Sequence, residues 1–209
     1  MVAELPDKNL FMMCPERRPD TFAPFPDGFS VRRMKASDLP AWMAMPFDNP
    51  REAETYHPYM EEYVARVYGQ DFERFFRQTT VVEQDGRMVG VCTRWKAYGK
   101  IETVQWLKVQ PECEGIGLGR ALMSWLLEHA EFPVYLHTQP ESFRAVGLYA
   151  DMGFLLLEGE AFGGRVNHVE QSMPYLKEHM TPQAFRRLTT VEAPASFSQV
   201  MAKVQTDDF

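Results

Sequence analysis

The sequence predicts an α+β domain built on a central mixed β-sheet. Three segments of alternating apolar residues follow one another from residue 79 to residue 109, joined by short turns that contain glycine. A glycine-rich turn then leads from the last strand into an amphipathic helix, and a further strand and helix follow. A meander of antiparallel strands, followed by strands that alternate with helices, indicates a mixed sheet with helices packed on it.

Length and composition are typical of one domain with a sizeable core. The chain has 209 residues, of which 45% are hydrophobic and 13% aromatic. Its formal net charge of -7 argues against nucleic acid or an anionic membrane as the main partner. The same acidity suits a basic substrate such as an amine.

The sequence also bears on the cellular location of the protein and on the role of its cysteines. No apolar run approaches the roughly 20 residues that span a bilayer, and residues 1–7 lack the basic and apolar regions of a signal peptide. We therefore expect a cytoplasmic protein. The cysteines, Cys14, Cys92 and Cys113, show no CxxC spacing and cannot all pair, so neither a disulfide framework nor a metal site is expected.

The N-terminal segment, residues 1–28, is rich in proline and shows little periodicity. We interpret it as an irregular arm on the surface of the domain, where Phe11, Phe22 and Phe25 give it something to bury; disorder is the alternative. Residues 29–34 then alternate as a first strand.

The region before the meander is expected to be helical. Ser37 and Asp38 can cap a helix that runs to Met45. Residues 52–78 are predicted to form a helix in two pieces, broken near Pro58. Tyrosines fall on more than one face of this segment: Tyr56, Tyr59, Tyr63 and Tyr68.

The meander has clear boundaries. A turn at Asp85-Gly86 joins the strands 79–83 and 89–97, and a second turn at 98–100 leads into the strand 101–109. Three antiparallel strands therefore precede the glycine-rich turn.

The glycine-rich turn is suited to binding phosphate. Pro111 ends the preceding strand because it cannot donate to a sheet ladder. Every second residue of this turn is a glycine: Gly115, Gly117 and Gly119. They lie just before and inside the first turn of the helix that begins near Gly117. Free amides and the positive end of the helix dipole attract anions there, and glycines let an anion come close. A plain tight turn with glycines that serve packing is the alternative.

Two familiar phosphate loops do not fit. A Walker loop needs Lys-Ser/Thr after its last glycine, whereas Arg120-Ala121 follows here. A dinucleotide fingerprint needs G-x-G-x-x-G, and the last interval in this chain is one residue short.

The segment after the helix contains a second helix with a distinctive face. Residues 134–138 form a short strand, and Ser142 can cap the helix that follows. Ala145 and Tyr149 lie one turn apart, so the small alanine leaves room beside the tyrosine ring. Gly153 ends the helix, and the next strand begins at the residue after it.

The C-terminal part gives weaker signals. Residues 165–172 are expected to form a strand, and residues 174–188 one or two short helices. The remainder has apolar residues that can pack on the domain or on a second subunit, as in a homodimer: Phe197, Val200 and Val204.

Two linked motifs resemble the GNAT family of acyl-CoA-dependent N-acetyltransferases. The family shows [QR]-x-x-G-x-[GA] between its fourth strand and third helix, and residues 114–119, EGIGLG, fit every position except the first. The family also shows N-x-x-A-x-x-x-Y-x-x-x-G-F after its fifth strand, and this chain has Ser142, Ala145, Tyr149, Gly153 and Phe154 at those positions. Glu114 departs from the pattern, since a carboxylate repels phosphate; we expect its side chain to turn away.

The resemblance implies a fold and a cofactor. The sheet should be splayed between the family's strands 4 and 5, here 101–109 and 134–138, with helices on both faces and acetyl-CoA in the splay. Residues 29–172 would form the acetyltransferase domain and residues 173–209 a helical extension. The residues that would bind the cofactor are Leu107, Lys108 and Val109 for pantetheine, Glu114, Gly115, Ile116, Gly117, Leu118, Gly119 and Arg120 for pyrophosphate, and Ser142 and Tyr149.

The resemblance also implies catalytic roles. Tyr149 would donate a proton to the departing thiolate. Aminolysis needs a neutral amine, so some group must accept the amine's proton; the family's usual acidic positions here carry Thr103 and Gln105. Glu102 and His137 are the alternatives for this general base, and each can instead be structural.

We therefore expect an N-acetyltransferase that moves an acetyl group from acetyl-CoA to a primary amine by direct attack. No cysteine falls where a nucleophile is needed, and Cys113 has no identified base. The aromatic residues between 56 and 68 favour a small-molecule amine as acceptor. The alternatives are an acyl-CoA-binding sensor without turnover and a protein N-acetyltransferase.

Overall fold

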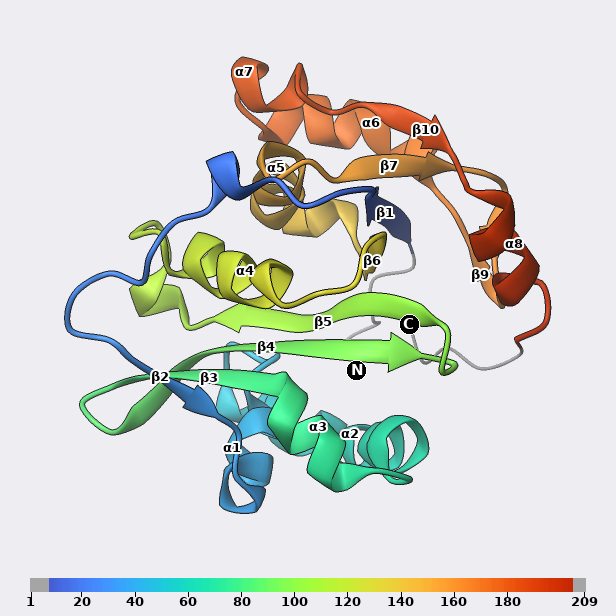
Figure 1. The fold of residues 1–209 in the computed structure, drawn as a ribbon. Helices are drawn as coiled ribbons and strands as arrows, with labels where there is room; N and C mark the ends of the chain where they lie inside the picture. Colours follow the sequence, from blue (N-terminus) through green and yellow to red (C-terminus); the bar gives the residue numbers. More distant parts are fainter. Residues whose placement is uncertain (1–7, 205–209) are drawn as a thin grey trace. The chain divides into compact units, whose positions relative to one another are not determined.

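The computed structural model describes residues 8–204. They fall into two compact units: unit 1 comprises residues 8–21, 96–103 and 131–204, and unit 2 comprises residues 22–95 and 104–130. The outer ends of the expected arm and tail, residues 1–7 and 205–209, lie outside the described part. Figure 1 identifies the helices and strands of both units.

Unit 2 contains the predicted meander. Its strands follow the order β5-β4-β3-β2, and β3 is antiparallel to both β2 and β4. The turn between β3 and β4 has left-handed backbone at Asp85 and Gly86, as the sequence predicts. The bounds are β2 (Ser30–Arg33), β3 (Thr79–Gln84), β4 (Arg87–Ala97) and β5 (Ile101–Val109), the last two of which have one end in unit 1.

The helices of unit 2 follow the prediction with one correction. They are η2 (Ala36–Asp38), α1 (Leu39–Ala44), α2 (Pro50–Tyr68), α3 (Phe72–Gln78), η3 (Pro111–Cys113) and α4 (Leu118–Glu128). The predicted break near Pro58 is wrong, because α2 continues through this exposed proline and water can satisfy the carbonyl that loses its partner. The break comes at residues 69–71, where Asp71 accepts from the Arg74 amide and caps α3.

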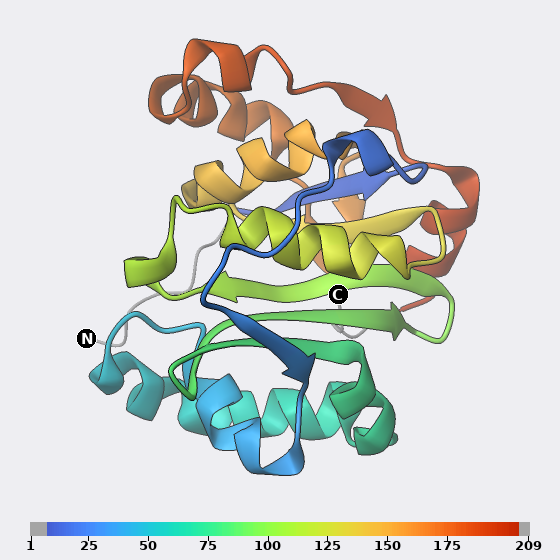
Figure 2. The ribbon, with the colours of Figure 1, turned by 60° about the vertical axis from the view of Figure 1, so that its left-hand side comes forward.

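These helices cover both faces of the unit 2 strands. In Figures 1 and 2, α1, α2 and α3 gather on one side of the strands and α4 on the other. On the first side the buried rings of Trp42, Tyr68 and Phe75 form the core. On the second side Gly90 of β4 lets α4 approach, since a Cβ there would lie 3.1 Å from Leu122 Cδ1.

The strands of unit 1 form a mixed sheet. Their order is β10-β7-β1-β6; β10 runs parallel to β7, whereas β1 is antiparallel to both of its neighbours. The predicted α+β class and mixed sheet are therefore confirmed. The bounds are β1 (Leu10–Cys14), β6 (Val134–Thr138), β7 (Leu155–Glu158) and β10 (Thr190–Glu192), with a separate hairpin of β8 (Ala161–Phe162) and β9 (Arg165–Val166).

Strand β1 corrects the interpretation of residues 1–28 as an irregular surface arm. Leu10–Cys14 is buried along its whole length and lies between β6 and β7. A strand covered on both faces reads as a continuous apolar run, and LFMMC is such a run. Met12, for example, pairs with Leu136 on one side and Leu156 on the other.

The C-terminal helices of unit 1 bring a second correction. The strand expected over residues 165–172 is only β9, and α6 begins at Val169. Asn167 follows the strand, and its side-chain amide donates to the carbonyls of Leu157 and Gly159. Val169, Ser172 and Leu176 are then buried at helical spacing. The helical bounds are η1 (Pro19–Thr21), η4 (Pro140–Ser142), α5 (Phe143–Asp151), α6 (Val169–His179), α7 (Pro182–Phe185) and α8 (Ala195–Met201).

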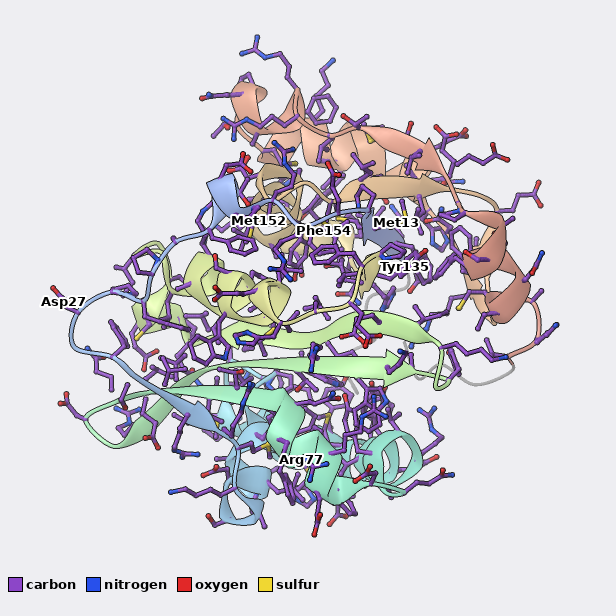
Figure 3. The ribbon with its side chains drawn as sticks, viewed as in Figure 1. Met13, Asp27, Arg77, Tyr135, Met152 and Phe154 are labelled. Atoms are coloured by element: carbon purple, nitrogen blue, oxygen red, sulfur yellow. The ribbon has the colours of Figure 1, made fainter. Side chains whose placement is uncertain are left out.

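The interior of unit 1 is made by side chains from segments far apart in the sequence. Met13, Met152 and Phe154 are buried together there (Figure 3). Within residues 8–204, no helix has both the length and the apolar character needed to cross a membrane.

Candidate active site

The glycine loop, residues 114–120, runs from the end of η3 into the first turn of α4 in unit 2. Gly115 and Gly117 have left-handed backbone, with φ of 79° and 92°, and Gly117 is the residue that precedes the helix. A Cβ on either glycine would meet no other atom within 4 Å. These two glycines therefore serve the backbone conformation and leave open space, which argues against a purely packing role.

The geometry at the start of α4 fits an anion. The first helical bond runs from the Ala121 amide to the Gly117 carbonyl, at 3.0 Å. The amides of Leu118 and Gly119 precede that bond and belong to the orphan donors of a helix N-terminus. The helix has 11 residues, so its dipole adds positive potential at the same end. Glu114 and Ile116 are exposed at the loop.

The end of β5 joins the loop through η3, so unit 2 brings together the residues expected to bind pantetheine and pyrophosphate. Leu107, Lys108 and Val109 are half-buried. The Lys108 ammonium pairs with the Asp48 carboxylate at 2.6 Å, which ties β5 to the segment between α1 and α2. No local pattern in the sequence indicates this pair, because 60 residues separate its members.

Trp106 breaks the alternation of β5. Its φ is 54°, a left-handed value that is uncommon for a bulky residue. As a result, consecutive side chains contact the same tyrosine: Gln105 Oε1 lies 3.5 Å from the Tyr63 hydroxyl, and the Trp106 ring lies 5.2 Å from the Tyr63 ring. In a regular strand, the side chains of neighbouring residues point to opposite faces of the sheet. The left-handed φ of Trp106 interrupts that alternation here.

The aromatic segment of α2 divides into core and surface. Tyr68 is fully buried, donates to Gln105 Oε1 and stacks on Phe75, so it is a core residue. Tyr63 is also buried. Tyr59, by contrast, is 38% exposed, which makes it available to an acceptor. Only part of the expected substrate-side cluster is therefore accessible.

Ser142 and Tyr149 lie on α5 in unit 1. Ser142 precedes the helix as predicted, but its side chain makes no capping hydrogen bond. Tyr149 is 6% exposed, and its ring lies 5.8 Å from the Phe154 ring. Gly153 ends the helix with φ of 94°, and the Phe154 amide donates to the Tyr149 carbonyl at 3.0 Å. The helix end therefore fixes the position of Tyr149.

His137 is held by two neighbours in unit 1. The Arg165 guanidinium can only donate, so the Nδ1 atom, 2.9 Å away, must accept. The Nε2 atom then carries the hydrogen and donates to Asn9 Oδ1 at 2.8 Å. Taking up a proton would break the Arg165 contact and place two cations side by side, so this geometry opposes a role as general base.

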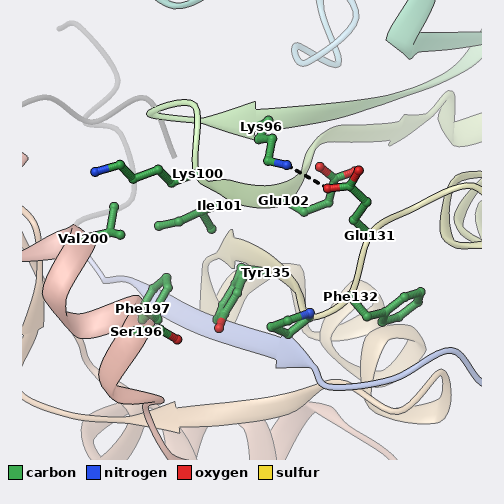
Figure 4. A pocket seen from close by; sticks show the side chains of 11 residues that line it. Lys96, Lys100, Ile101, Glu102, Glu131, Phe132, Tyr135, Ser196, Phe197 and Val200 are labelled. Atoms are coloured by element: carbon green, nitrogen blue, oxygen red, sulfur yellow. Dashed lines mark hydrogen bonds and ion pairs between the residues drawn. The ribbon is translucent and has the colours of Figure 1, made fainter.

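Glu102 lies at the start of β5 within unit 1. The residue is only 7% exposed, and it lines a cavity together with Lys96, Glu131 and Tyr135 (Figure 4). A carboxylate in such a place can hold a cation or accept a proton. The sequence indicated Glu102, but not the residues that share its cavity.

All three cysteines are buried and free of disulfides. Burial raises the pKa of the Cys14 thiol to about 11 and also raises the pKa of Cys92. Cys113 is 3% exposed, and its Sγ atom lies 3.8 Å from Gln84 Oε1. Thiols in these surroundings are poor nucleophiles.

The sequence was then compared with known proteins. Residues 39–154, more than half of the chain, match the family described as "Acetyltransferase (GNAT) family". The chain belongs to the GNAT acetyltransferase family. The matched residues include β5, the glycine loop, α4 and α5, which carry both motifs. The search of curated proteins gave no match.

Solved structures share the GNAT fold with this chain. One is a conserved protein of unknown function from Staphylococcus epidermidis, with 13% identity, 71% of this chain and 57% of that chain covered, and a TM-score of 0.52. Another is a GNAT-family acetyltransferase from Colwellia psychrerythraea, with 13% identity, 73% and 54% covered, and a TM-score of 0.52. This GNAT chain thus spans little more than half the length of those proteins.

Proposed function

We propose that this GNAT protein transfers the acetyl group of acetyl-CoA to a primary amine of a small molecule. The observation that carries the proposal is the glycine loop before α4, where Gly115 and Gly117 face open space. Helix-terminal amides without a Cβ nearby bind the pyrophosphate of coenzyme A well. Membership of an acetyltransferase family then supports acyl transfer as the reaction.

The proposed reaction is direct aminolysis of the thioester. The nitrogen lone pair of the neutral amine attacks the carbonyl carbon and forms the C–N bond. The C–S bond then breaks, and the thiolate takes a proton from the Tyr149 hydroxyl. Glu114–Arg120 and Leu107–Val109 are proposed to hold the cofactor, and Ser142 to assist at the start of α5.

We propose Glu102 as the general base. Both ring nitrogens of His137 are engaged, by Asn9 and by Arg165, so His137 is the weaker candidate. A carboxylate such as that of Glu102 has the chemistry to accept the amine's proton, directly or through water.

We also propose a chemical class for the acceptor and a location for the protein. The exposed Tyr59 and the net charge of -7 support a small basic acceptor. No nucleic-acid or membrane partner and no metal are proposed, and the location proposed from the sequence is cytoplasmic. In the described part of the C-terminal extension, Phe197 packs inside unit 1, so the proposal does not require a homodimer.

Titration calorimetry with acetyl-CoA and CoA tests the cofactor site. Gly117→Trp should weaken binding by about tenfold or more, since the indole fills the space for phosphate and disturbs the loop. Gly28→Trp is the matched control, because Gly28 also has left-handed backbone, with φ of +86°, and open space around its Cβ position. Equal affinities of the two variants would refute the loop as the binding site.

Turnover distinguishes the remaining alternatives. A library of small primary amines should include acetylated products if the proposal holds. Binding of acetyl-CoA without turnover of amines or peptides would identify a sensor, and turnover of peptides alone would identify a protein N-acetyltransferase.

A further inference from the structure

Unit 2 has an exposed tryptophan on the solvent face of α4. Trp125 is 36% exposed, although its neighbours Ser124 and Leu126 are buried in the same helix. The chain segment before β2 runs alongside α4 (Figure 2), and the Ala23 amide donates to the Ser124 hydroxyl at 3.0 Å. Phe25 of this segment lies beside the indole, with ring centroids 6.2 Å apart. Two aromatic rings from distant parts of unit 2 thus form one apolar patch.

A guanidinium lies over this patch. The Cζ atom of Arg33, the last residue of β2, is 6.0 Å from the centre of the Trp125 ring, which is a cation–π distance. The Arg33 side chain also donates to the Thr80 hydroxyl of β3 at 3.1 Å, so the neighbouring strand orients it. His129, one turn further along α4, lies 5.5 Å from the indole. We call Phe25, Arg33, Trp125 and His129 the Trp125 surface.

The charge of Arg33 is not neutralised by a carboxylate. Among residues 8–204, Arg33 forms no ion pair, and neither do the exposed Asp27 and Glu128. Burial and the nearby positive charge of Arg94 both lower the pKa of Arg33, but a guanidinium stays protonated at neutral pH. Arg94 is already engaged, since it donates to the His129 carbonyl at the end of α4. Arg33 is therefore the cation available to a ligand, and a carboxylate suits its planar fork of donors.

We propose that the Trp125 surface binds an acidic segment of a partner protein, with a carboxylate on Arg33 and an aromatic side chain of the partner against Trp125 and Phe25. Tryptophan and arginine are the residue types that contribute most to binding at protein interfaces. The formal net charge of -7 disfavours acidic partners elsewhere, so a local cation makes this face selective. None of its residues lines the cavity of unit 1, which favours a protein over a small molecule that needs an enclosing pocket. The inference goes beyond the proposed acetyl transfer and does not depend on it.

Fluorescence anisotropy tests the proposal with the full chain and without acetyl-CoA. The probe is a fluorescein-labelled peptide of sequence EDFDE, compared with QNFNQ, which lacks the charges, and EDGDE, which lacks the ring. EDFDE should bind with a Kd of about 100 μM or tighter, and each of the other peptides about tenfold more weakly or worse. Arg33→Gln should weaken EDFDE binding by about tenfold or more, because a charge-assisted contact is lost. Trp125→Ala should have a similar effect, and Trp125→Phe, which keeps an aromatic ring, should recover part of the affinity.

Arg77→Gln is the matched control, since it removes one positive charge from α3 of unit 2, where Arg77 is exposed and pairs with Glu73 (Figure 3). It should bind EDFDE within about twofold of the wild type. The proposal is overturned if the wild type does not bind EDFDE, if QNFNQ or EDGDE binds equally, or if folded Arg33→Gln, checked by thermal melting, keeps wild-type affinity. Self-association of the wild type that Trp125→Ala abolishes, measured by analytical ultracentrifugation, would overturn it in favour of a second copy of the chain.

Discussion

Arg32 on β2 links this strand to η2 and to β3 through two carboxylates. Its two terminal guanidinium nitrogens donate to Asp38 of η2, at 2.6 and 3.0 Å, and one of them also donates to Glu83 of β3, at 2.6 Å. The Arg32 hydrogen bonds hold the pKa of both carboxyls below their usual range. The Lys35 amide also donates to Asp38, at 2.7 Å. Asp38 thus connects β2 to the start of α1.

Asp38→Asn should lower the free energy of unfolding by about 1–2 kcal/mol at pH 7, because a partly buried charge-assisted pair is lost. A carboxyl whose folded pKa is depressed stabilises the protein above its unfolded pKa, here near 3.8, and less as pH falls through the folded value. The difference between wild type and variant should therefore shrink below about pH 4. Urea unfolding at several pH values measures it.

Asp27→Asn is the control for that series, since Asp27 is exposed. It should match the wild type within about 0.5 kcal/mol at every pH. A wild type and an Asp38→Asn variant of equal stability at pH 7 would show that the charged pair of Arg32 and Asp38 contributes no net stabilisation.

Tyr149 is the residue on which proton donation depends in the proposed reaction. Tyr149→Phe keeps the ring against Phe154 and removes only the hydroxyl, so kcat should fall by about 10²- to 10⁴-fold with little change in the KM for acetyl-CoA. Steady-state kinetics with an accepted amine measure both constants. Tyr175→Phe should leave kcat unchanged, because that ring stacks on His179 and has no proposed part in the reaction. A Tyr149→Phe enzyme within about threefold of wild type would require another proton donor.

At the scale of elements, β1 is the strand that the rest of unit 1 depends on. It pairs with β6 over all five of its residues and with β7 at Met12 and Met13. Leu10, Phe11 and Met12 have no exposed surface. Removing β1 would leave β6 and β7 each with one unpaired edge, so the packing of β1 should contribute a large share of the stability of unit 1.

Leu10→Ala should lower the free energy of unfolding by about 2–5 kcal/mol, the usual cost of a cavity in a buried core. Chemical denaturation followed by circular dichroism gives the value. Val166→Ala, at a side chain that is 54% exposed, should change stability by no more than about 0.5 kcal/mol. A small effect of Leu10→Ala would favour the peripheral arm that the sequence predicts over the central strand.

For the whole molecule, the proposed cofactor should act as a stabiliser. A ligand that binds only the folded state at 100 times its Kd adds about 2.7 kcal/mol. For a chain of this size that corresponds to a rise in Tm of roughly 5–11 °C. Thermal melts with and without acetyl-CoA should show the rise for wild type and Gly28→Trp, and little or none for Gly117→Trp. The same rise in both variants would place the ligand away from the glycine loop.

The sequence by itself determined the features that depend on local chemistry. The alternation over residues 79–109, the Asp85-Gly86 turn and the start of α4 at Leu118 were all predictable, because each reflects neighbours in the chain. The two motifs identified the family for the same reason, since each occupies one short segment. The placement of Tyr149 by Gly153 also follows from local helix-end geometry.

Only the tertiary structure decided which distant segments meet. The position of β1 between β6 and β7 depends on hydrogen bonds to residues more than 100 positions away, for which local periodicity gives no signal. The tertiary structure also decided which groups contact His137 and that Phe197 stacks on Tyr135. It likewise showed that α2 continues through Pro58. The left-handed backbone at Trp106 occurs together with packing against Trp42 and Tyr63, contacts that form only when the chain has folded.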